Sequence, residues 1–343
     1  MAAGQHTADV NQLPATHVVL GAGPVGRAVV AALATRGVTP AVVTRSGTAV
    51  PGASSRSADI SDPAQAAAAV AGAQVVFQCT SPPYHQWAAK FPALQASVVD
   101  AAAAAGALLV AAENLYGYGP GTGPLTEDRP LTATTRKGAV RARLWQDLAA
   151  AHQAGRLRVV AGRASDFYGP GVGRGSIVGD RFFGALLRGK PAEVLGDPDR
   201  LHTYTYIGDF GEALVALSET ESTWGRAWHV PSAPAVTTRS FAAQAADLAG
   251  TLPSSTGVPS TGPRLRRLPA WQLRLFGLAV PAVREMPEML YQFEQDWVVD
   301  WSAYAAAVGG RATPMRTALA ATVAAQAGPA QPAAPVNPAG PAK

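Results

Sequence analysis

The pattern of apolar and polar positions divides the first half of the chain into alternating strands and helices. Short apolar runs rich in β-branched residues predict buried strands, at residues 17–20, 41–44, 74–79, 107–112 and 157–161. Alanine-rich stretches between them predict helices, at residues 27–34, 93–105 and 137–150 and from Pro63 onward, behind the capping residue Asp62. Such alternation indicates parallel strands joined by helical crossovers. The sequence therefore predicts an α/β fold with a doubly wound parallel sheet of the Rossmann type.

The alternation becomes less regular after residue 162, where we expect a smaller, mixed lobe folded over the ligand edge of the sheet. Its expected elements are a helix near 176–187, strands near Glu193 and Thr203, a helix at 209–217, a strand at 228–231, a helix at 240–249 and mixed pieces to about residue 326. The predicted organisation is a flexible leader (1–14), a dinucleotide-binding domain (15–162), a substrate lobe (163–326) and a disordered tail rich in proline and alanine (327–343).

A glycine-rich turn follows the first strand, and three glycines, Gly21, Gly23 and Gly26, form a G-x-G-x-x-G pattern there. The first glycine allows a tight turn, the second lets the backbone approach a pyrophosphate, and the third lets the helix pack closely on the strand. Pro24 and Val25 complete the turn that would hold the phosphates. The alternative is a tight strand-to-helix turn that binds no ligand.

The end of the second strand bears on the choice between NAD and NADP. An acidic residue there would hold the ribose 2′-hydroxyl, whereas an arginine suits a 2′-phosphate. The chain has Arg45 at this place and no acid until Asp59, so we favour NADP over NAD, with a solvent-facing arginine as the alternative. Asp59 is expected to contact the adenine amino group or else to serve only as a turn residue. Cys79, at the end of the third central strand, is expected beside the cofactor as a small packing residue.

Composition limits the classes of partner and compartment. The 343 residues include 15% charged residues, and the formal net charge is +5 without a long basic run, so we expect no nucleic-acid partner. A single cysteine excludes an internal disulfide and favours a cytoplasmic location. No metal-binding spacing, signal peptide or membrane-spanning run is found, so we expect no metal and no membrane partner. The expected partner is a small-molecule substrate, and a homodimer is left open.

Candidate reaction chemistry lies after the fourth central strand, in the polar and aromatic segment 113–120. Ligands collect at the carboxyl ends of strands in open α/β sheets, so this segment is expected to face the substrate. Asn114 and Tyr116 are its main candidates, and Tyr116 is our first choice for a proton donor; ring packing against the loop is the alternative for Tyr116. Lys137, in the following helix, is a third candidate, either as a catalytic group, as a ligand of the nicotinamide ribose or as a solvated helix residue.

With these landmarks the chain resembles the extended short-chain dehydrogenase/reductase superfamily, of the NAD-dependent epimerase/dehydratase type. The resemblance covers roughly residues 15–325 and rests on GAGPVG, the pair Asp59-Ile60, ENLYGYG, RASDFYGPGV at 163–172 and HTYTYIGDFGEAL at 202–214. It implies a pyridine-dinucleotide enzyme with a substrate lobe.

Two features depart from the family's usual pattern. The glycine motif is one residue shorter than the usual G-x-x-G-x-x-G. The family's chemistry also uses Tyr-x-x-x-Lys on one helix face, where the lysine lowers the tyrosine pKa, and none of the eight tyrosines here has a lysine at the fourth following position. Lys137 is about where the family's lysine would be, but position 133 is Ala133, and the family's serine appears as Ala111 or Ala112.

Two functional hypotheses follow. The first is an atypical NADP(H)-dependent reductase or epimerase-like enzyme with relocated acid–base groups. Its further candidates are Glu113, Tyr118, Asp166 and Tyr168. Ring packing is the alternative for Tyr118, and a turn cap is favoured over a base for Asp166. The second is a non-catalytic regulator that senses NADP(H) and signals its occupancy to a protein partner. The missing tyrosine favours the regulator, while the complete second lobe with polar loops at the cleft favours the enzyme. The sequence does not identify the substrate.

Overall fold

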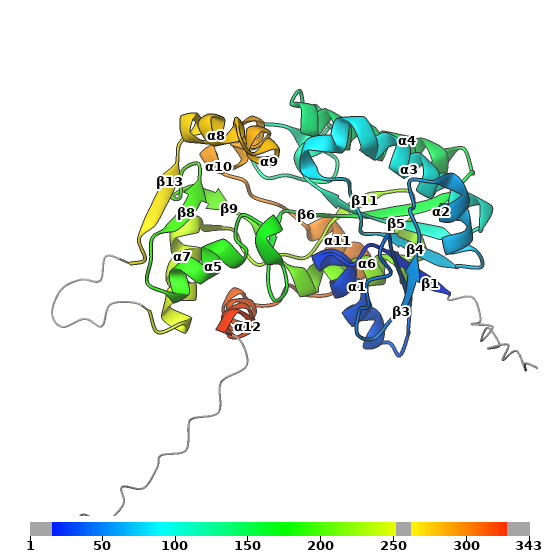
Figure 1. The fold of residues 1–343 in the computed structure, drawn as a ribbon, viewed down its shortest axis with the longest axis horizontal. Coiled ribbons are helices and arrows are strands. Elements are labelled where there is room, and N and C mark those ends of the chain that lie inside the picture. The colour runs from blue at the N-terminus through cyan, green and yellow to red at the C-terminus, as the bar shows by residue number, and fades with distance from the viewer. Residues whose placement is uncertain (1–15, 252–261, 328–343) are drawn as a thin grey trace, which may run out of the picture.

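A seven-stranded parallel sheet forms the centre of the molecule, in the computed structural model that describes residues 16–251 and 262–327 (Figure 1). The strand order is β11-β6-β5-β4-β1-β2-β3. The strands are β1 (His17–Leu20), β2 (Ala41–Thr44), β3 (Ser54–Ser57), β4 (Val75–Gln78), β5 (Leu108–Asn114), β6 (Arg158–Ala164) and β11 (Ala227–His229). The predicted doubly wound sheet is confirmed, because strands are added outward on both sides of β1. The predicted leader and nearly all of the predicted tail lie outside the described residues.

Helices cover both faces of this sheet (Figure 1). One face packs against α2 (Pro63–Val70), α3 (Trp87–Ala104) and α4 (Arg136–Gln153), and the other against α1 (Pro24–Ala34), α6 (Ile207–Glu219) and α11 (Ser302–Val308). Strands buried on both faces are apolar at nearly every position. Val18, Val19 and Leu20 of β1 accordingly have at most 1% of their surface exposed. This burial on both faces explains why strands such as β1 could be predicted from the sequence.

The starts of the first two helices follow from their first residues. Helix α1 begins at Pro24, three residues before the predicted start, because Gly23 is its extended N-cap and proline suits the first helical position. Helix α2 begins at Pro63, as predicted. The Asp62 carboxylate caps it by accepting hydrogen bonds from the backbone N–H groups of Ala64 (2.9 Å) and Gln65 (3.0 Å).

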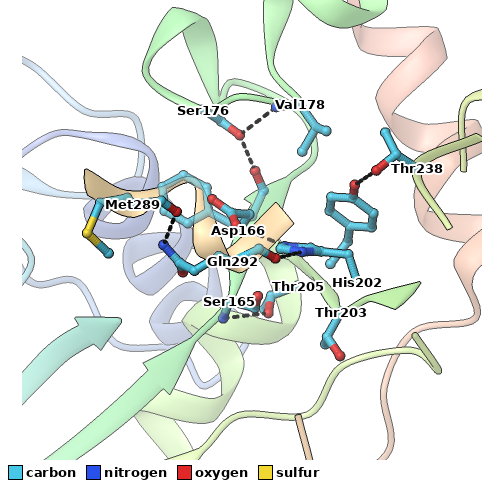
Figure 2. A network of polar contacts seen from close by, with 12 residues as sticks. Ser165, Asp166, Ser176, Val178, His202, Thr203, Thr205, Thr238, Met289 and Gln292 are labelled. Carbon is cyan, nitrogen blue, oxygen red and sulfur yellow. Dashed lines mark hydrogen bonds and ion pairs between the residues drawn. The ribbon is translucent and has the colours of Figure 1, made fainter. Parts of the chain in front are cut away.

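Other boundaries also differ from the sequence prediction, and three of them lie at residues that line the cleft. Helix α3 begins at Trp87 and contains Pro92 in its interior. Strand β5 extends two residues further, to Asn114, because it pairs with β6 along its whole length. The helix expected from residue 176 begins only at Asp180, since the Ser176 side chain forms a turn in which it donates to the Phe167 carbonyl (2.7 Å) and accepts from the Val178 N–H (3.2 Å; Figure 2).

The second lobe is a smaller, mixed structure beside the carboxyl edge of the sheet (Figure 1). Its core joins Tyr168, Tyr204 and Phe241 with helices α5 (Asp180–Leu187), α7 (Thr238–Leu248) and α12 (Met315–Ala327). Three two-stranded sheets are formed by β7 (Asp166–Tyr168) with β10 (Tyr204–Tyr206), β9 (Leu201–His202) with β12 (Val236–Thr237), and β8 (Ala192–Leu195) with β13 (Leu265–Leu268). The remaining helices are α8 (Ala270–Gly277), α9 (Pro281–Arg284) and α10 (Tyr291–Glu294), and the 3-10 turns are η1 (Tyr84–Gln86), η2 (Tyr116–Tyr118), η3 (Gly173–Gly175), η4 (Glu221–Thr223) and η5 (Pro287–Met289).

The chain returns to the main sheet after residue 162. Strand β11 pairs in parallel with β6, with Trp228 opposite Gly162. Helix α6 packs on α1 at Gly211, where an added Cβ would collide with the backbone of Ala28. The main sheet therefore has two strands more than the five that the helical crossovers predicted, and part of the sequence between residues 163 and 326 belongs to the sheet layer.

Candidate functional site

A cleft of about 970 Å³ lies at the carboxyl ends of the central strands. It runs from the glycine turn after β1 and the end of β2, past the end of β4, to the end of β5 and the start of β7. Of the predicted site residues, those that line it are Gly21, Gly23, Pro24, Val25, Arg45, Asp59, Cys79, Glu113, Asn114, Tyr116 and Asp166. The β1–β4 junction, where the direction of strand addition reverses, is the position at which such sheets bind ligands.

The glycine turn has the geometry of a phosphate-binding loop. Gly21 has φ +106°, a conformation that L side chains rarely adopt. Gly26 faces away from the cleft, and an added Cβ would collide with the Gly21 carbonyl oxygen, so its role is to let α1 pack closely on the turn. At Gly23 a Cβ would have no atom within 4 Å. The backbone before α1 is thus open on the side where a diphosphate would approach.

Arg45, which follows β2, and Asp59, which follows β3, also line the cleft. Arg45 follows β2, its side chain is exposed, and its backbone carbonyl accepts a hydrogen bond from the Ser57 hydroxyl (2.8 Å). Asp59 accepts hydrogen bonds from the Ser61 hydroxyl (2.6 Å) and backbone N–H (3.0 Å), which lower the pKa of the carboxyl group. One oxygen of Asp59 is therefore engaged in a turn while the residue lines the cleft.

Cys79 lies at the floor of the cleft, directly after β4. Burial raises the pKa of its thiol to about 12, so the sulfur is protonated at neutral pH and is not a thiolate nucleophile. Its backbone N–H donates to the Leu20 carbonyl (3.0 Å), and its carbonyl lies where a Cβ on Gly21 would come within 3.1 Å. This close packing fits a small residue that lets the glycine turn lie against β4.

Asn114 and Tyr116 lie together at the end of β5. The Asn114 side-chain oxygen accepts from the Tyr116 backbone N–H (3.2 Å) and from Arg141 Nε (3.2 Å). The Tyr116 ring packs beside Trp87, with 6.0 Å between ring centroids. Burial raises the pKa of the Tyr116 phenol well above its ordinary value, and Arg141 acts in the opposite direction. The phenol is therefore protonated at neutral pH and beside a guanidinium.

Helix α4 presents Arg141, and not Lys137, to the cleft. Lys137 Nζ is 2.5 Å from Glu285 Oε2, and 2% of the Lys137 side chain is exposed. The same ammonium lies 4.8 Å from the centroid of the Tyr84 ring. One turn later, the Arg141 guanidinium lies over Trp87 (5.0 Å) and lines the cleft. Lys137 itself does not line the cleft, whereas Tyr84, whose ring its ammonium approaches, does.

The sequence profile of the NAD dependent epimerase/dehydratase family matches residues 17–230, which is more than half of the chain. The chain belongs to this family. Among curated proteins, a sequence search finds no significant match. The family resemblance drawn from the sequence motifs is confirmed by this match.

Solved structures of the same fold cover nearly the whole chain. They include UDP-glucose 4-epimerase from Thermotoga maritima with UDP-glucose (TM-score 0.69, 17% identity, 90% of this chain and 97% of that chain). UDP-glucuronic acid 4-epimerase from Bacillus cereus in complex with NAD is also similar (0.68, 14%, 91% and 98%). A third is a double mutant of dTDP-glucose 4,6-dehydratase from Streptomyces venezuelae with NAD bound (0.70, 18%, 90% and 95%). At these identities the similarity shows the fold alone. Within the described residues, no helix is both long and apolar enough to span a bilayer.

The second lobe contributes side chains to the cleft of this family member that the sequence did not single out. Gln292 lines it, and His202 contacts Asp166, a predicted candidate that lines the cleft, with 3.0 Å between Nε2 and Oδ2 (Figure 2). Tyr84 and Arg141 were missed as well. The spacing of four between Lys137 and Arg141 on one helix face was a signal that could have pointed to Arg141, whereas His202 and Gln292 are 36 and 126 positions from Asp166 and gave none.

The structure separates the remaining tyrosine candidates from the cleft. Tyr118 and Tyr168 have no exposed surface and do not line it. The Tyr118 hydroxyl instead accepts from Arg163 (2.7 Å) and lies 2.8 Å from His229 Nε2. Glu113 lines the cleft and forms a buried ion pair with Arg163 across β5 and β6 (3.5 Å).

Proposed function

We propose that this family member is an NADP(H)-dependent oxidoreductase, a reductase or epimerase-like enzyme that lacks the Tyr-x-x-x-Lys pair. The observation that carries the proposal is that the glycine turn, Asn114 and the Tyr116 phenol open into one cleft. The residues fit a dinucleotide, because Gly23 leaves open space in front of the N-terminus of α1. Two of the similar structures named above hold NAD.

The preference for NADP rests on Arg45. It is the cation at the end of β2, and it lines the cleft beside Asp59. A guanidinium at this position can donate two hydrogen bonds to the oxygens of a 2′-phosphate. A ribose hydroxyl has a single uncharged oxygen and cannot accept this pair of hydrogen bonds. We therefore propose NADP(H) as the cofactor and NAD(H) as the weaker ligand.

A reduced nicotinamide cofactor, if bound, would be held by the glycine turn and Arg45 and would supply hydride-transfer chemistry to this cleft. In the proposed reaction Tyr116 gives its phenolic proton to the oxygen of a substrate carbonyl. The raised pKa of Tyr116 keeps this proton in place at neutral pH. Arg141 then stabilises the phenolate that remains, as the family's lysine otherwise would. Asn114 holds both partners, since its side-chain oxygen accepts from Arg141 and from the Tyr116 backbone.

We test this role with NADPH consumption in the presence of sugar nucleotides, steroids, flavonoid-like ketones and small aldehydes. Tyr116→Phe removes the proton but keeps the ring against Trp87, and we expect turnover to fall about 100-fold with unchanged affinity for NADPH. Full activity in Tyr116→Phe would show that the proton comes from another group.

The second candidate function is a non-catalytic regulator that responds to NADP(H) occupancy. It is favoured by Lys137, which is held by Glu285 and excluded from the cleft. A protein that binds NADPH but consumes none with any of the carbonyl compounds, and that binds a protein partner only with NADP(H) present, would support the regulator over the enzyme.

A further inference from the structure

A carboxylate and an imidazole form a close pair at the substrate end of the cleft (Figure 2). Asp166 is the first residue of β7 and lines the cleft, and His202 is the last residue of β9. His202 Nε2 is 3.0 Å from Asp166 Oδ2, and 3% and 18% of the two side chains are exposed. The ring is therefore buried, while the carboxylate has one side toward the cleft.

The hydrogen bonds of His202 require one proton more than a neutral ring supplies. Its Nδ1 lies 3.2 Å from the backbone carbonyl oxygen of Gln292, which can only accept, so Nδ1 carries a hydrogen. In a neutral ring Nε2 would then be an acceptor, facing the acceptor Asp166 Oδ2. The 3.0 Å contact becomes a hydrogen bond only if Nε2 or Asp166 is also protonated.

His229 shows the contrasting case in the same chain. Its Nδ1 also faces a backbone carbonyl oxygen, that of Asp300 (2.8 Å), but its Nε2 faces the Tyr118 hydroxyl (2.8 Å). A hydroxyl can donate, so the neutral ring satisfies both contacts. Burial accordingly lowers the pKa of His229 to about 4. The difference between the two histidines is the partner of Nε2, a donor in one case and a carboxylate in the other.

Packing fixes the His202 ring in this position. The ring stacks on Phe293 (4.8 Å between centroids, 14° between planes) and contacts Tyr204. The Tyr204 hydroxyl lies 2.8 Å from the Thr238 hydroxyl. Titratable groups that interact with Asp166 include Tyr204 and, on the cleft side, Tyr84 and Tyr116. Among the described residues, the partners of the two His202 ring nitrogens are the Gln292 carbonyl and Asp166.

We propose that Asp166 and His202 share one proton and form a second acid–base site of the cleft. This inference rests on the proposed reductase function. Asp166 is the residue that would touch the substrate, and His202 is a positioning residue that acts through it.

When the pair acts, its shared proton passes from the pair to an oxygen atom of the substrate. An O–H bond forms there as the N–H or O–H bond of the pair breaks, which leaves an ionised Asp166 and a neutral His202. The recognised substrate group is an oxygen other than the one that Tyr116 protonates, and not an anionic phosphate.

The shared proton is tested by nitrogen NMR of the histidine rings in the full chain, with His202→Gln used to assign the His202 signals. At neutral pH we expect His202 to be protonated at both nitrogens, or at Nδ1 with Asp166 protonated, as carboxyl carbon NMR would show. If the wild-type ring carries both protons, Asp166→Asn should remove the second one, because the amide can donate to Nε2, while the His229 signals stay unchanged. A neutral His202 beside an ionised Asp166, or a doubly protonated ring that is unaffected by Asp166→Asn, would overturn the proposal.

The acid–base role is tested with the carbonyl compound that is consumed fastest by the wild-type protein. Asp166→Asn should lower kcat by about 100-fold with unchanged NADPH affinity, and Tyr204→Phe, which keeps the ring against His202, should leave kcat within about twofold. Full activity of Asp166→Asn rejects the role. If no compound is consumed, the role falls with the proposed function, whereas the NMR result still decides whether the proton is shared.

Discussion

Tyr118 lies outside the cleft, and its hydroxyl joins two buried polar side chains. It accepts a hydrogen bond from Arg163 (2.7 Å) and donates to His229 Nε2 (2.8 Å), since His229 Nδ1 is committed to the Asp300 carbonyl. Arg163 also pairs with Glu113, which reaches the cleft. The network thus holds β5, β6 and β11 in register behind the site.

Removing the Tyr118 hydroxyl should destabilise the fold. In Tyr118→Phe, a guanidinium N–H and an imidazole nitrogen lose their partner in the interior, and we expect a loss of about 1–3 kcal/mol in the free energy of unfolding, measured with urea. Tyr291→Phe is the matched control, because the buried Tyr291 hydroxyl has no hydrogen-bond partner among the described residues. A control that is destabilised as much as Tyr118→Phe would contradict this explanation.

His229 should make the stability depend on pH. Burial lowers its pKa from 6.5 to about 4, so between these values the unfolded chain binds a proton that the folded chain does not. The free energy of unfolding is therefore nearly unaffected by His229 above the unfolded pKa of 6.5. It falls as the pH drops toward the folded pKa, by about 2 kcal/mol from about pH 7 to about pH 5. Urea unfolding at both pH values should show a smaller drop for His229→Gln. The exposed His85 provides the control variant, His85→Gln; an equal drop in all three proteins would count against the role of His229.

At the scale of elements, the strand β1, the glycine turn and helix α1 combine a packing requirement with a binding requirement. Gly26 serves packing, because an added Cβ would collide with the Gly21 carbonyl. For Gly23 we propose a role in binding the dinucleotide, because it has φ −71° and ψ −176°, which any residue adopts, and open space where a Cβ would project.

The two glycines can therefore be separated by substitution. Gly23→Val should keep the thermal unfolding temperature close to that of the wild type but abolish dinucleotide binding, because the side chain fills the space in front of α1. Gly26→Ala should lower the unfolding temperature itself. The measurements are thermal unfolding and calorimetric titration of both variants, and unimpaired binding by Gly23→Val would reject the phosphate-binding role of the turn.

How much the sequence predicted also differs between elements. Strands buried on both faces, such as β1 and β4, were found because nearly every position is apolar, and α2 was found from the cap Asp62 before Pro63. Strand β5 was placed two residues short because its last residues are polar, and only the pairing with β6 shows that Glu113 lies opposite Arg163. Local patterns identify an element, but its end depends on a partner that the sequence does not reveal.

At the scale of the whole molecule, predicting the site required knowing which distant segments of the chain meet. The glycine turn, Arg45, Asn114 and Tyr116 could be placed at the cleft from the sequence, because all of them follow strands whose carboxyl ends share one edge. Lys137 could not, since its partner Glu285 is 148 positions away and draws its ammonium away from the cleft. His202 was missed for the same reason, because its contacts with Asp166 and Gln292 join distant segments of the second lobe.

The central proposals are that the cleft binds NADP and that Arg45 makes the protein prefer NADP over NAD. Calorimetric titration of the full chain with NADP⁺ and with NAD⁺ tests this directly. We expect one site per chain with tighter binding of NADP⁺, and we expect Arg45→Ala to weaken NADP⁺ about tenfold or more while NAD⁺ changes little; Arg143→Ala, on the outer surface of α4, serves as the control. Absence of heat with either nucleotide would contradict the account, and an equal loss for both in Arg45→Ala would remove the phosphate-binding role.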